Sequence, residues 1–174
     1  IFRILPYQKK KAGIVTTGSE VYYHRIEDKF TPVVIEKLKE CGVTEVKQIR
    51  CNDDHEMITE AIQTLIEDGS DLIVCTGGMS VDPDDRTPGA IKAAGADIVS
   101  YGAPVLPGAM FLLGYFEDGT PVMGLPGCVM YAGATVFDLM LPKIAADVPV
   151  TRADITALGE GGLCLGCAEC HYVS

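Results

Sequence analysis

The segment from 74 to 91, VCTGGMSVDPDDRTPGAI, combines flexible backbone with concentrated negative charge. A short apolar run ends at Thr76, and Gly77 and Gly78 follow. Because glycines tolerate positive φ, consecutive N–H groups of this turn can converge on an anion. Thr87 and Pro88 then suit the N-cap and first position of a helix, whose end adds free N–H donors. We therefore predict an anion-binding loop; the alternative is a tight turn that is rich in glycine for its geometry.

Three aspartates, Asp82, Asp84 and Asp85, follow the two glycines. Carboxylates beside a phosphate site repel the ligand unless a cation lies between them or a proton is moved. Asp53 or Asp54, which follow the preceding strand pattern, can supply a carboxylate from the opposite side of the site. Carboxylates from two separate loops suit a Mg²⁺ ion that bridges phosphates. Asp82 and Asp84 fit solvated loop charges better, which leaves Asp85 as the candidate. The alternative for Asp53 or Asp54 is to cap the helix that follows.

Two more turns carry small polar or glycine-containing sequences, TTGSEV at 16–21 and GLPGC at 124–128. The first offers short hydroxyl donors and a carboxylate, and the second is a candidate for converging N–H groups at a turn into a long helix. Each is ordinary turn chemistry when taken singly. Ligands of open α/β sheets collect beyond the carboxyl ends of the strands. We therefore expect four turns to converge at one sheet edge: 16–20, 52–54, 76–85 and 125–128.

Strand and helix patterns alternate along the chain, which predicts an α/β fold with a mostly parallel sheet and helices on both faces. The predicted strands are 12–16, 44–50, 71–75, 97–101 and a pair within 109–125 joined by a hairpin at Asp118-Gly119. The predicted helices lie within 28–42 and 52–70, at 88–94, and within the apolar stretch 124–145. Residues 1–11 resemble a strand entering from upstream, so we expect an excised part of a longer chain.

Length and charge restrict the class of protein. The 174 residues suffice for one domain with a sizeable core, predicted at 1–150, with an irregular Cys-rich tail at 151–174. The formal net charge of −10 argues against a broad grip on nucleic acid or an anionic membrane. The sequence shows neither a signal peptide nor an apolar run of the ~18 residues that a membrane span needs. We expect a cytoplasmic protein with a small-molecule partner.

The seven cysteines fall into two groups. Cys41, Cys51, Cys75 and Cys128 are scattered among the predicted elements, where free buried thiols are the ordinary outcome. The tail places three more at a spacing of three residues, next to His171. Such thiolates can bind Zn²⁺ or an iron–sulfur cluster, or can belong to a disordered tail; CAECH also matches c-type haem attachment. The predicted tail ligands are Cys164, Cys167 and Cys170.

The sequence TGGMSVDPDDRTPGAI resembles the signature of the molybdopterin-binding domain family of molybdenum-cofactor biosynthesis. TTGSEV resembles the turn after the first strand in its molybdenum-insertion branch. CNDDHEMI resembles the family's Asp-Asp turn, and VLPG and GLPGC resemble its two Pro-Gly segments. The resemblance runs from about Ile14 to Ile144 with every segment in order.

This resemblance implies a three-layer α/β/α sandwich with a pocket for molybdopterin, a phosphorylated pterin. In relatives the pocket also handles adenylated molybdopterin, and Mg²⁺-assisted insertion of molybdate occurs there. Asp85 and Asp53 fall on the acidic positions, as candidate catalytic residues and ligands of Mg²⁺ or molybdate. Relatives commonly self-associate, so we expect a homo-oligomer. The candidate cofactor-binding residues are Thr17, Gly18, Ser19, Glu20, Thr76, Gly77, Gly78, Ser80, Pro126 and Gly127.

Two positions depart from the family pattern. Cys128 stands where Pro-Gly is usually followed by asparagine, and Ala109 stands where many relatives carry lysine. Each lost charge-assisted bond weakens the grip on phosphate by ~1–3 kcal/mol. Three hypotheses follow: a molybdopterin molybdenumtransferase, a non-catalytic module that senses or carries the pterin cofactor, and a nucleotide-processing enzyme of the competence-damage-inducible type.

Overall fold

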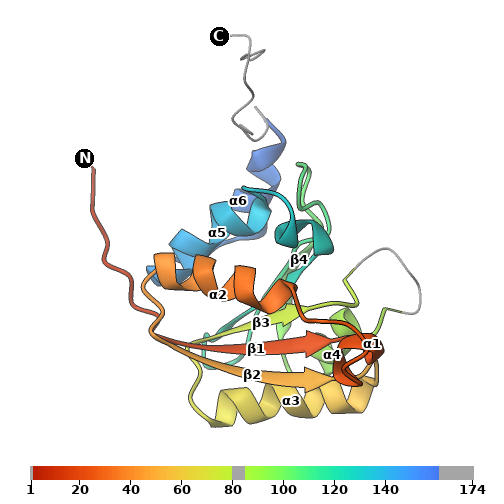
Figure 1. Cartoon of the computed structure of the whole chain (residues 1–174). Helices are drawn as coiled ribbons and strands as arrows, with labels where there is room; N and C mark the ends of the chain where they lie inside the picture. The colour runs from red at the N-terminus through yellow and green to blue at the C-terminus, as the bar shows by residue number, and fades with distance from the viewer. Residues whose placement is uncertain (1, 80–84, 161–174) are drawn as a thin grey trace.

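A six-stranded sheet forms the centre of the computed structural model, which describes residues 2–79 and 85–160 (Figure 1). The strand order is β2 (Glu45–Cys51), β1 (Lys11–Thr17), β3 (Leu72–Thr76), β6 (Pro121–Leu125), β5 (Leu112–Tyr115) and β4 (Asp97–Tyr101). The first four strands in this order pair in parallel, and β5 pairs antiparallel with both of its neighbours. The predicted mostly parallel sheet is confirmed.

Helices cover both faces of the sheet, which gives the three layers that the family resemblance implies (Figure 1). On one face lie α2 (Phe30–Glu40), α5 (Val136–Ala145) and α6 (Arg152–Thr156), whose apolar side chains join one buried cluster. On the other face lie α3 (His55–Glu67) and α4 (Thr87–Ala93), which join a second cluster. A short α1 (Ser19–Tyr22) follows β1 at the sheet edge.

Strand β3 shows why an uninterrupted apolar sequence forms the middle of this sheet. All five of its residues are buried. Leu72 and Val74 point into the cluster with α2 and α5, whereas Ile73 and Cys75 point into the cluster with α3 and α4. Successive side chains of a strand point to opposite faces, so a strand covered on both sides needs apolar residues throughout.

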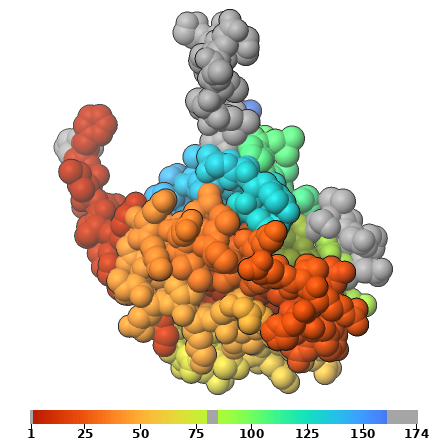
Figure 2. Space-filling view, viewed as in Figure 1, coloured from red at the N-terminus to blue at the C-terminus, as the bar shows by residue number. Residues whose placement is uncertain are grey.

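The structure corrects the sequence-based prediction at both ends of the chain. Residues 2–10 form no strand, and the first of them project from the body of the molecule (Figure 2). At the other end, α6 and a 3-10 helix, η2 (Ala157–Gly159), lie within the segment predicted to be irregular. Ile155 of α6 is buried in the core, so its apolar side chain holds this short helix against the domain.

Two helix starts also differ from the prediction. The long helix does not follow the Pro126-Gly127 turn directly, because the 3-10 helix η1 (Gly127–Met130) intervenes before α5 begins at Val136. Thr87 is the first residue of α4 and not its N-cap, a position that Arg86 occupies. The side chain of Thr87 instead bonds to the turn after β3, as described below.

Three of the scattered cysteines confirm the prediction of free buried thiols: Cys41, Cys51 and Cys75. Burial raises the pKa of Cys51 to about 11, and burial followed by the nearby Cys51 raises the pKa of Cys75 further. Both thiols are therefore protonated and unreactive at neutral pH. No helix within residues 2–79 and 85–160 is long and apolar enough to cross a membrane.

The packing of α3 on the sheet gives a test of the fold. A Cβ atom at Gly13 would lie 2.9 Å from Ile73 Cδ1 and 2.9 Å from Leu65 Cβ. We expect Gly13→Ala to lower the free energy of unfolding by about 1–3 kcal/mol, because α3 must move away from β1. Urea denaturation measures this change. Gly133→Ala is the matched control, since no atom lies within 4 Å of its added Cβ; equal losses in both variants would contradict the packing described.

Candidate functional site

The carboxyl ends of four parallel strands meet at one edge of the sheet. Thr17 at the end of β1 pairs with Cys51 at the end of β2, and Thr76 at the end of β3 pairs with Leu125 at the end of β6. Thr16 of β1 pairs with Thr76, which places β1 and β3 side by side at this edge. The four turns therefore leave the sheet together, as expected from the sequence.

Two buried threonines, Thr17 and Thr87, join the turn after β1 to the turn after β3. The hydroxyl of Thr17 donates to the carbonyl of Thr76 at 3.1 Å, and the hydroxyl of Thr87 donates to the carbonyl of Gly77 at 2.9 Å. The two hydroxyl oxygens lie 3.4 Å apart. We call Thr17 and Thr87 the threonine pair. It satisfies two backbone carbonyls where the sheet hydrogen bonding ends.

The glycines of the turn after β3 permit this close approach. Gly77 and Gly78 have φ values of 86° and 56°. A Cβ at Gly77 would lie 2.5 Å from the carbonyl oxygen of Thr17, and one at Gly78 would lie 2.6 Å from Oγ1 of Thr87. Both the positive φ and the lack of space require glycine. The geometry of the turn therefore explains both glycines, and anion binding by this turn stays a prediction.

Asp53 and Asp54 have different roles. Oδ2 of Asp53 accepts hydrogen bonds from the backbone N–H of Ser19 at 2.9 Å and from its hydroxyl at 2.8 Å, which links the turns after β2 and β1. Oδ1 of Asp54 accepts from the N–H of Met57 at 2.9 Å and caps α3. The capping alternative is therefore correct for Asp54. Asp53 is exposed and remains the candidate for metal binding.

Asp85 lies half-buried just before α4. Partial burial, and then the charge of Asp85, raise the pKa of Tyr101 at the end of β4, so this carboxylate faces the β4 side of the edge. Within residues 2–79 and 85–160, no three His, Cys, Asp or Glu residues are grouped to hold a metal ion. The metal-binding role of Asp53 and Asp85 stays a prediction. The other predicted positions Ser80, Asp82, Asp84, Cys164, Cys167, Cys170 and His171 lie outside the described residues.

A pocket of about 540 Å³ opens beside the threonine pair, and we call it the carboxyl-edge pocket. Its volume lies in the range of small-molecule sites. Of the predicted residues, Thr17, Thr76 and Gly77 line it, and Gly127 begins the 3-10 helix whose last residue, Met130, lines it. Thr16 also lines the pocket and lies in the predicted turn 16–20, whereas sequence reasoning missed the other lining residues: Val21, Ile26, Glu27, Asp28, Lys29, Phe30, Met130 and Tyr131.

Thr76 lines this pocket and carries an unsatisfied hydroxyl. Thr76 is 1% exposed, and its Oγ1 has no hydrogen-bond partner among the described residues. A buried hydroxyl without a partner costs about 1–3 kcal/mol of stability. Native structures rarely keep such a group without a reason. Because Thr76 lines the pocket, a ligand there can supply the missing hydrogen bond.

Asp28 organises the start of α2 on another wall of the pocket. Its Oδ2 accepts from the hydroxyl of Thr31 at 2.6 Å and from the side-chain amide of Gln48 at 2.8 Å, and Oδ1 accepts from the N–H groups of Phe30 and Thr31. Partial burial acts to raise the pKa of Asp28, but these hydrogen bonds outweigh it and lower the pKa below 3.8. The spacing of Asp28 and Thr31 before an apolar run was the sequence signal for this capping arrangement.

The pocket is amphipathic. Buried threonine side chains form its inner part, and the exposed side chains of Tyr131 and Ile26 lie at its outer part. Tyr131 is 83% exposed, so its ring can still gain contact area on binding. Such a pocket suits a planar heteroaromatic molecule that has a polar end. Fold and pocket together define an α/β protein with a candidate small-molecule site beyond the carboxyl ends of its parallel strands.

The family follows from comparison with known sequences. Residues 13–146 match the model described as a probable molybdopterin binding domain. Since this range is most of the chain, the chain belongs to that family.

The similar proteins include CinA-like proteins and molybdopterin biosynthesis proteins. A CinA-like protein of Mycobacterium tuberculosis is 38% identical over 77 residues, which are 44% of this chain and 18% of that protein. The solved structure of CinA from Thermoplasma acidophilum superimposes with a TM-score of 0.64 and 19% identity, over 78% of this chain and 98% of that one. A molybdopterin biosynthesis MoeA protein from Pyrococcus horikosii gives 0.63 and 25%, over 80% and 35%.

The hydrogen bonds of the threonines predict that removing the hydroxyl of Thr87 and removing that of Thr76 affect stability differently. Thr87→Val leaves the carbonyl of Gly77 without its donor, so we expect a loss of about 1–3 kcal/mol in the free energy of unfolding. Thr76→Val removes a hydroxyl that has no partner and should leave stability unchanged or raise it. Chemical denaturation of both variants compares them directly. A Thr76→Val variant as unstable as Thr87→Val would contradict the assigned bonding.

The lowered pKa of Asp28 predicts a pH dependence. A carboxyl whose folded-state pKa lies below the ordinary 3.8 stabilises the fold above that value, and the contribution is lost as the pH falls through the folded-state pKa. Asp28→Asn should be less stable than the parent at pH 7, and the difference should shrink below pH 3.8. Urea titrations of both proteins from pH 7 downward measure it. A difference that stays constant with pH would show that Asp28 carries no such linkage.

Proposed function

We propose that the carboxyl-edge pocket binds molybdopterin and that the protein acts in molybdenum-cofactor biosynthesis. The observation that carries the proposal is the unpartnered hydroxyl of Thr76, a residue that lines an amphipathic pocket at the strand ends. The family match supports a pterin as the ligand. An unpaired buried hydroxyl and an exposed aromatic ring match the two kinds of surface that a pterin presents.

Different residues of the pocket contact different parts of the ligand. The pterin ring packs against Tyr131 and Ile26, where apolar area is still exposed. Thr76 supplies a hydrogen bond to a polar group of the ligand. Phosphate binds at the backbone N–H groups of the turn at Gly77 and of the turn that begins η1 at Gly127.

A Mg²⁺ ion would require the ligand for a complete coordination shell. Oδ2 of Asp53 is occupied by Ser19, so its other oxygen is the one to offer a metal. Asp85, with Tyr101 nearby, is the second proposed carboxylate. Mg²⁺ takes six oxygen ligands, which two carboxylates cannot provide, and phosphate oxygens and water would complete the set. When bound, the ion would neutralise phosphate charge while molybdate is inserted.

The departures from the family pattern bear on the choice between insertion and simple binding. Cys128 lies in η1, and Ala109 lies before β5. Alanine has no donor for phosphate, and the thiol of Cys128 is only a weak one. These positions favour a module that binds the pterin without turnover over the molybdenumtransferase.

A second candidate is a nucleotide-processing activity of the CinA type. The match to CinA-like proteins favours it. A nucleobase is also planar and heteroaromatic, so the carboxyl-edge pocket can take it in the same way. The affinity for the two ligand classes distinguishes the candidates.

The proposal is tested by titrating the chain with molybdopterin, adenylated molybdopterin, NAD and ADP-ribose, with binding followed by calorimetry. We expect the pterins to bind most tightly, and Thr76→Val to weaken them about tenfold through loss of one hydrogen bond. Thr64→Val, at an exposed position of α3, is the matched control and should bind like the parent. Failure of both pterins to bind would overturn the proposal, and tighter binding of NAD or ADP-ribose would favour the CinA-type activity.

Turnover separates the transferase from the module. With pterin bound, molybdate and Mg²⁺ are added: a transferase gives insertion, which Asp53→Asn and Asp85→Asn should both abolish while their unfolding curves stay close to that of the parent. Pterin binding without insertion in the parent would assign the non-catalytic module. Normal turnover in either variant would remove that aspartate from the mechanism.

A further inference from the structure

One side chain that is not among the lining residues of the carboxyl-edge pocket joins two parts of its lining. Gln48 lies on the edge strand β2, beside Ile14 of β1 in the sheet register. Its Nε2 lies 2.9 Å from Oγ1 of Thr16, 2.8 Å from Oδ2 of Asp28 and 3.0 Å from Oγ1 of Thr31. The three distances show that these oxygens converge on one nitrogen atom.

The oxygens that Gln48 contacts belong to the sheet and to one side of the pocket. Thr16 belongs to β1, whereas Asp28 lies in the segment 26–30, all five residues of which line the pocket. We call this segment the 26–30 wall. Oδ1 of Asp28 accepts from the N–H of Phe30, so the carboxylate also holds the start of α2. Gln48 therefore ties the 26–30 wall to the sheet.

The hydroxyl protons of the two threonines are committed inside this network. The hydroxyl of Thr31 donates to Oδ2 of Asp28 at 2.6 Å. A hydroxyl has one proton, so Thr16, whose Oγ1 lies 2.9 Å from that of Thr31, is the donor of that pair. The amide of Gln48 supplies the remaining protons. A glutamine suits this position because its side-chain nitrogen carries two protons and no charge.

The carboxylate of Asp28 is held by these hydrogen bonds without an ion pair. Glu27 and Lys29, which flank it in the sequence, form no ion pair among the described residues. Lys47 of β2 is paired with Asp68. The donors around Asp28 therefore decide where its charge, and the wall that carries it, can lie.

We propose that Gln48 is a positioning residue of the carboxyl-edge pocket, and that its uncharged amide holds the 26–30 wall where the ligand requires it. The inference rests on the proposed function, because molybdopterin is the ligand used to test it. When the amide is lost, the wall occupies other positions as well. The apparent affinity then falls in proportion to the time that the wall spends in the binding position.

The first variant is Gln48→Met, which keeps the length of the side chain and removes both donors. We expect molybdopterin to bind about tenfold more weakly by calorimetry, as for a wall that holds the binding position about a tenth of the time. The same variant without ligand should change the amide chemical shifts of Thr16 and of residues 26–31, measured on the isotope-labelled chain.

The second variant, Gln48→Glu, has a pH profile that a packing role would not give. At pH 7 the introduced carboxylate faces that of Asp28, and the two repel each other. As the pH falls toward 5, the pair takes up a shared proton, which restores a donor between the two oxygens. We expect the affinity of this variant, divided by that of the parent at the same pH, to rise toward one. The ratio cancels any titration of the ligand itself.

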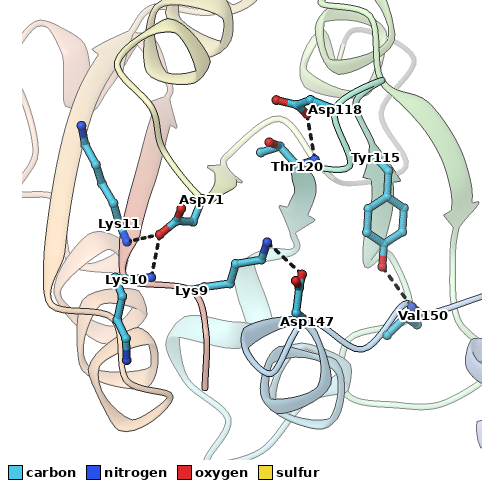
Figure 3. A network of polar contacts seen from close by, with 9 residues as sticks. All are labelled: Lys9, Lys10, Lys11, Asp71, Tyr115, Asp118, Thr120, Asp147 and Val150. Atoms are coloured by element: carbon cyan, nitrogen blue, oxygen red, sulfur yellow. Dashed lines mark hydrogen bonds and ion pairs between the residues drawn. The ribbon is translucent and has the colours of Figure 1, made fainter. Parts of the chain in front are cut away.

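The opposite edge of the sheet provides a control for lost stability. Oδ2 of Asp71 accepts from the N–H groups of Lys10 and Lys11 at 2.7 and 2.8 Å (Figure 3). Asp71→Ala removes both bonds and should lower stability. Asp71 precedes β3, whose length of roughly 16 Å separates it from Thr76 at the pocket. This variant should therefore bind molybdopterin like the parent.

Three results would overturn the inference: parent-like binding by Gln48→Met, equally weakened binding by Asp71→Ala, or an affinity ratio of Gln48→Glu that stays constant with pH. If the parent itself does not bind molybdopterin, the proposed function fails and the shifts without ligand decide the inference. Changed shifts of residues 26–31 in Gln48→Met would then support it, and unchanged shifts would contradict it.

Discussion

The close contact between the turns after β1 and β3 is the constraint on which the candidate site depends. The threonine pair bonds to the carbonyls of Thr76 and Gly77, and glycine at 77 and 78 leaves no Cβ between the turns. The hydroxyl of Thr17 thus adds a side-chain hydrogen bond between the last residues of β1 and β3, and that of Thr87 ties α4 to the turn after β3. The carboxyl-edge pocket lies beside this contact, and Val21 of α1 and Phe30 of α2 line it.

The two edges of the sheet have different chemistry for the same topological reason. Parallel strands gather their carboxyl ends at one edge, where threonine hydroxyls and an exposed tyrosine surround the pocket. Their beginnings gather at the other edge, where Asp71 holds the backbone of Lys10 and Lys11 and further aspartates follow. Each edge keeps one buried hydroxyl unpaired, Thr76 and Ser70.

The sequence predicted what depends on local pattern and missed what depends on distant contacts. The apolar run of β3 and the Asp118-Gly119 hairpin were found because their period and turn residues are local signals. The N-cap prediction for Thr87 was wrong because its hydroxyl bonds to Gly77, ten positions away. Asp28 had a local signal in its spacing to Thr31, but its contact with Gln48 of β2 is one that sequence spacing does not reveal.

The family and the pocket together support a pterin-binding domain, while the CinA-like relatives keep a nucleotide ligand as the rival. The most direct measurement is a crystal structure of the chain grown with molybdopterin. The account predicts ligand density in the carboxyl-edge pocket, with a polar atom at hydrogen-bond distance from Oγ1 of Thr76 and the ring against Tyr131. Density located elsewhere, with Thr76 still unpaired, would contradict the central claim.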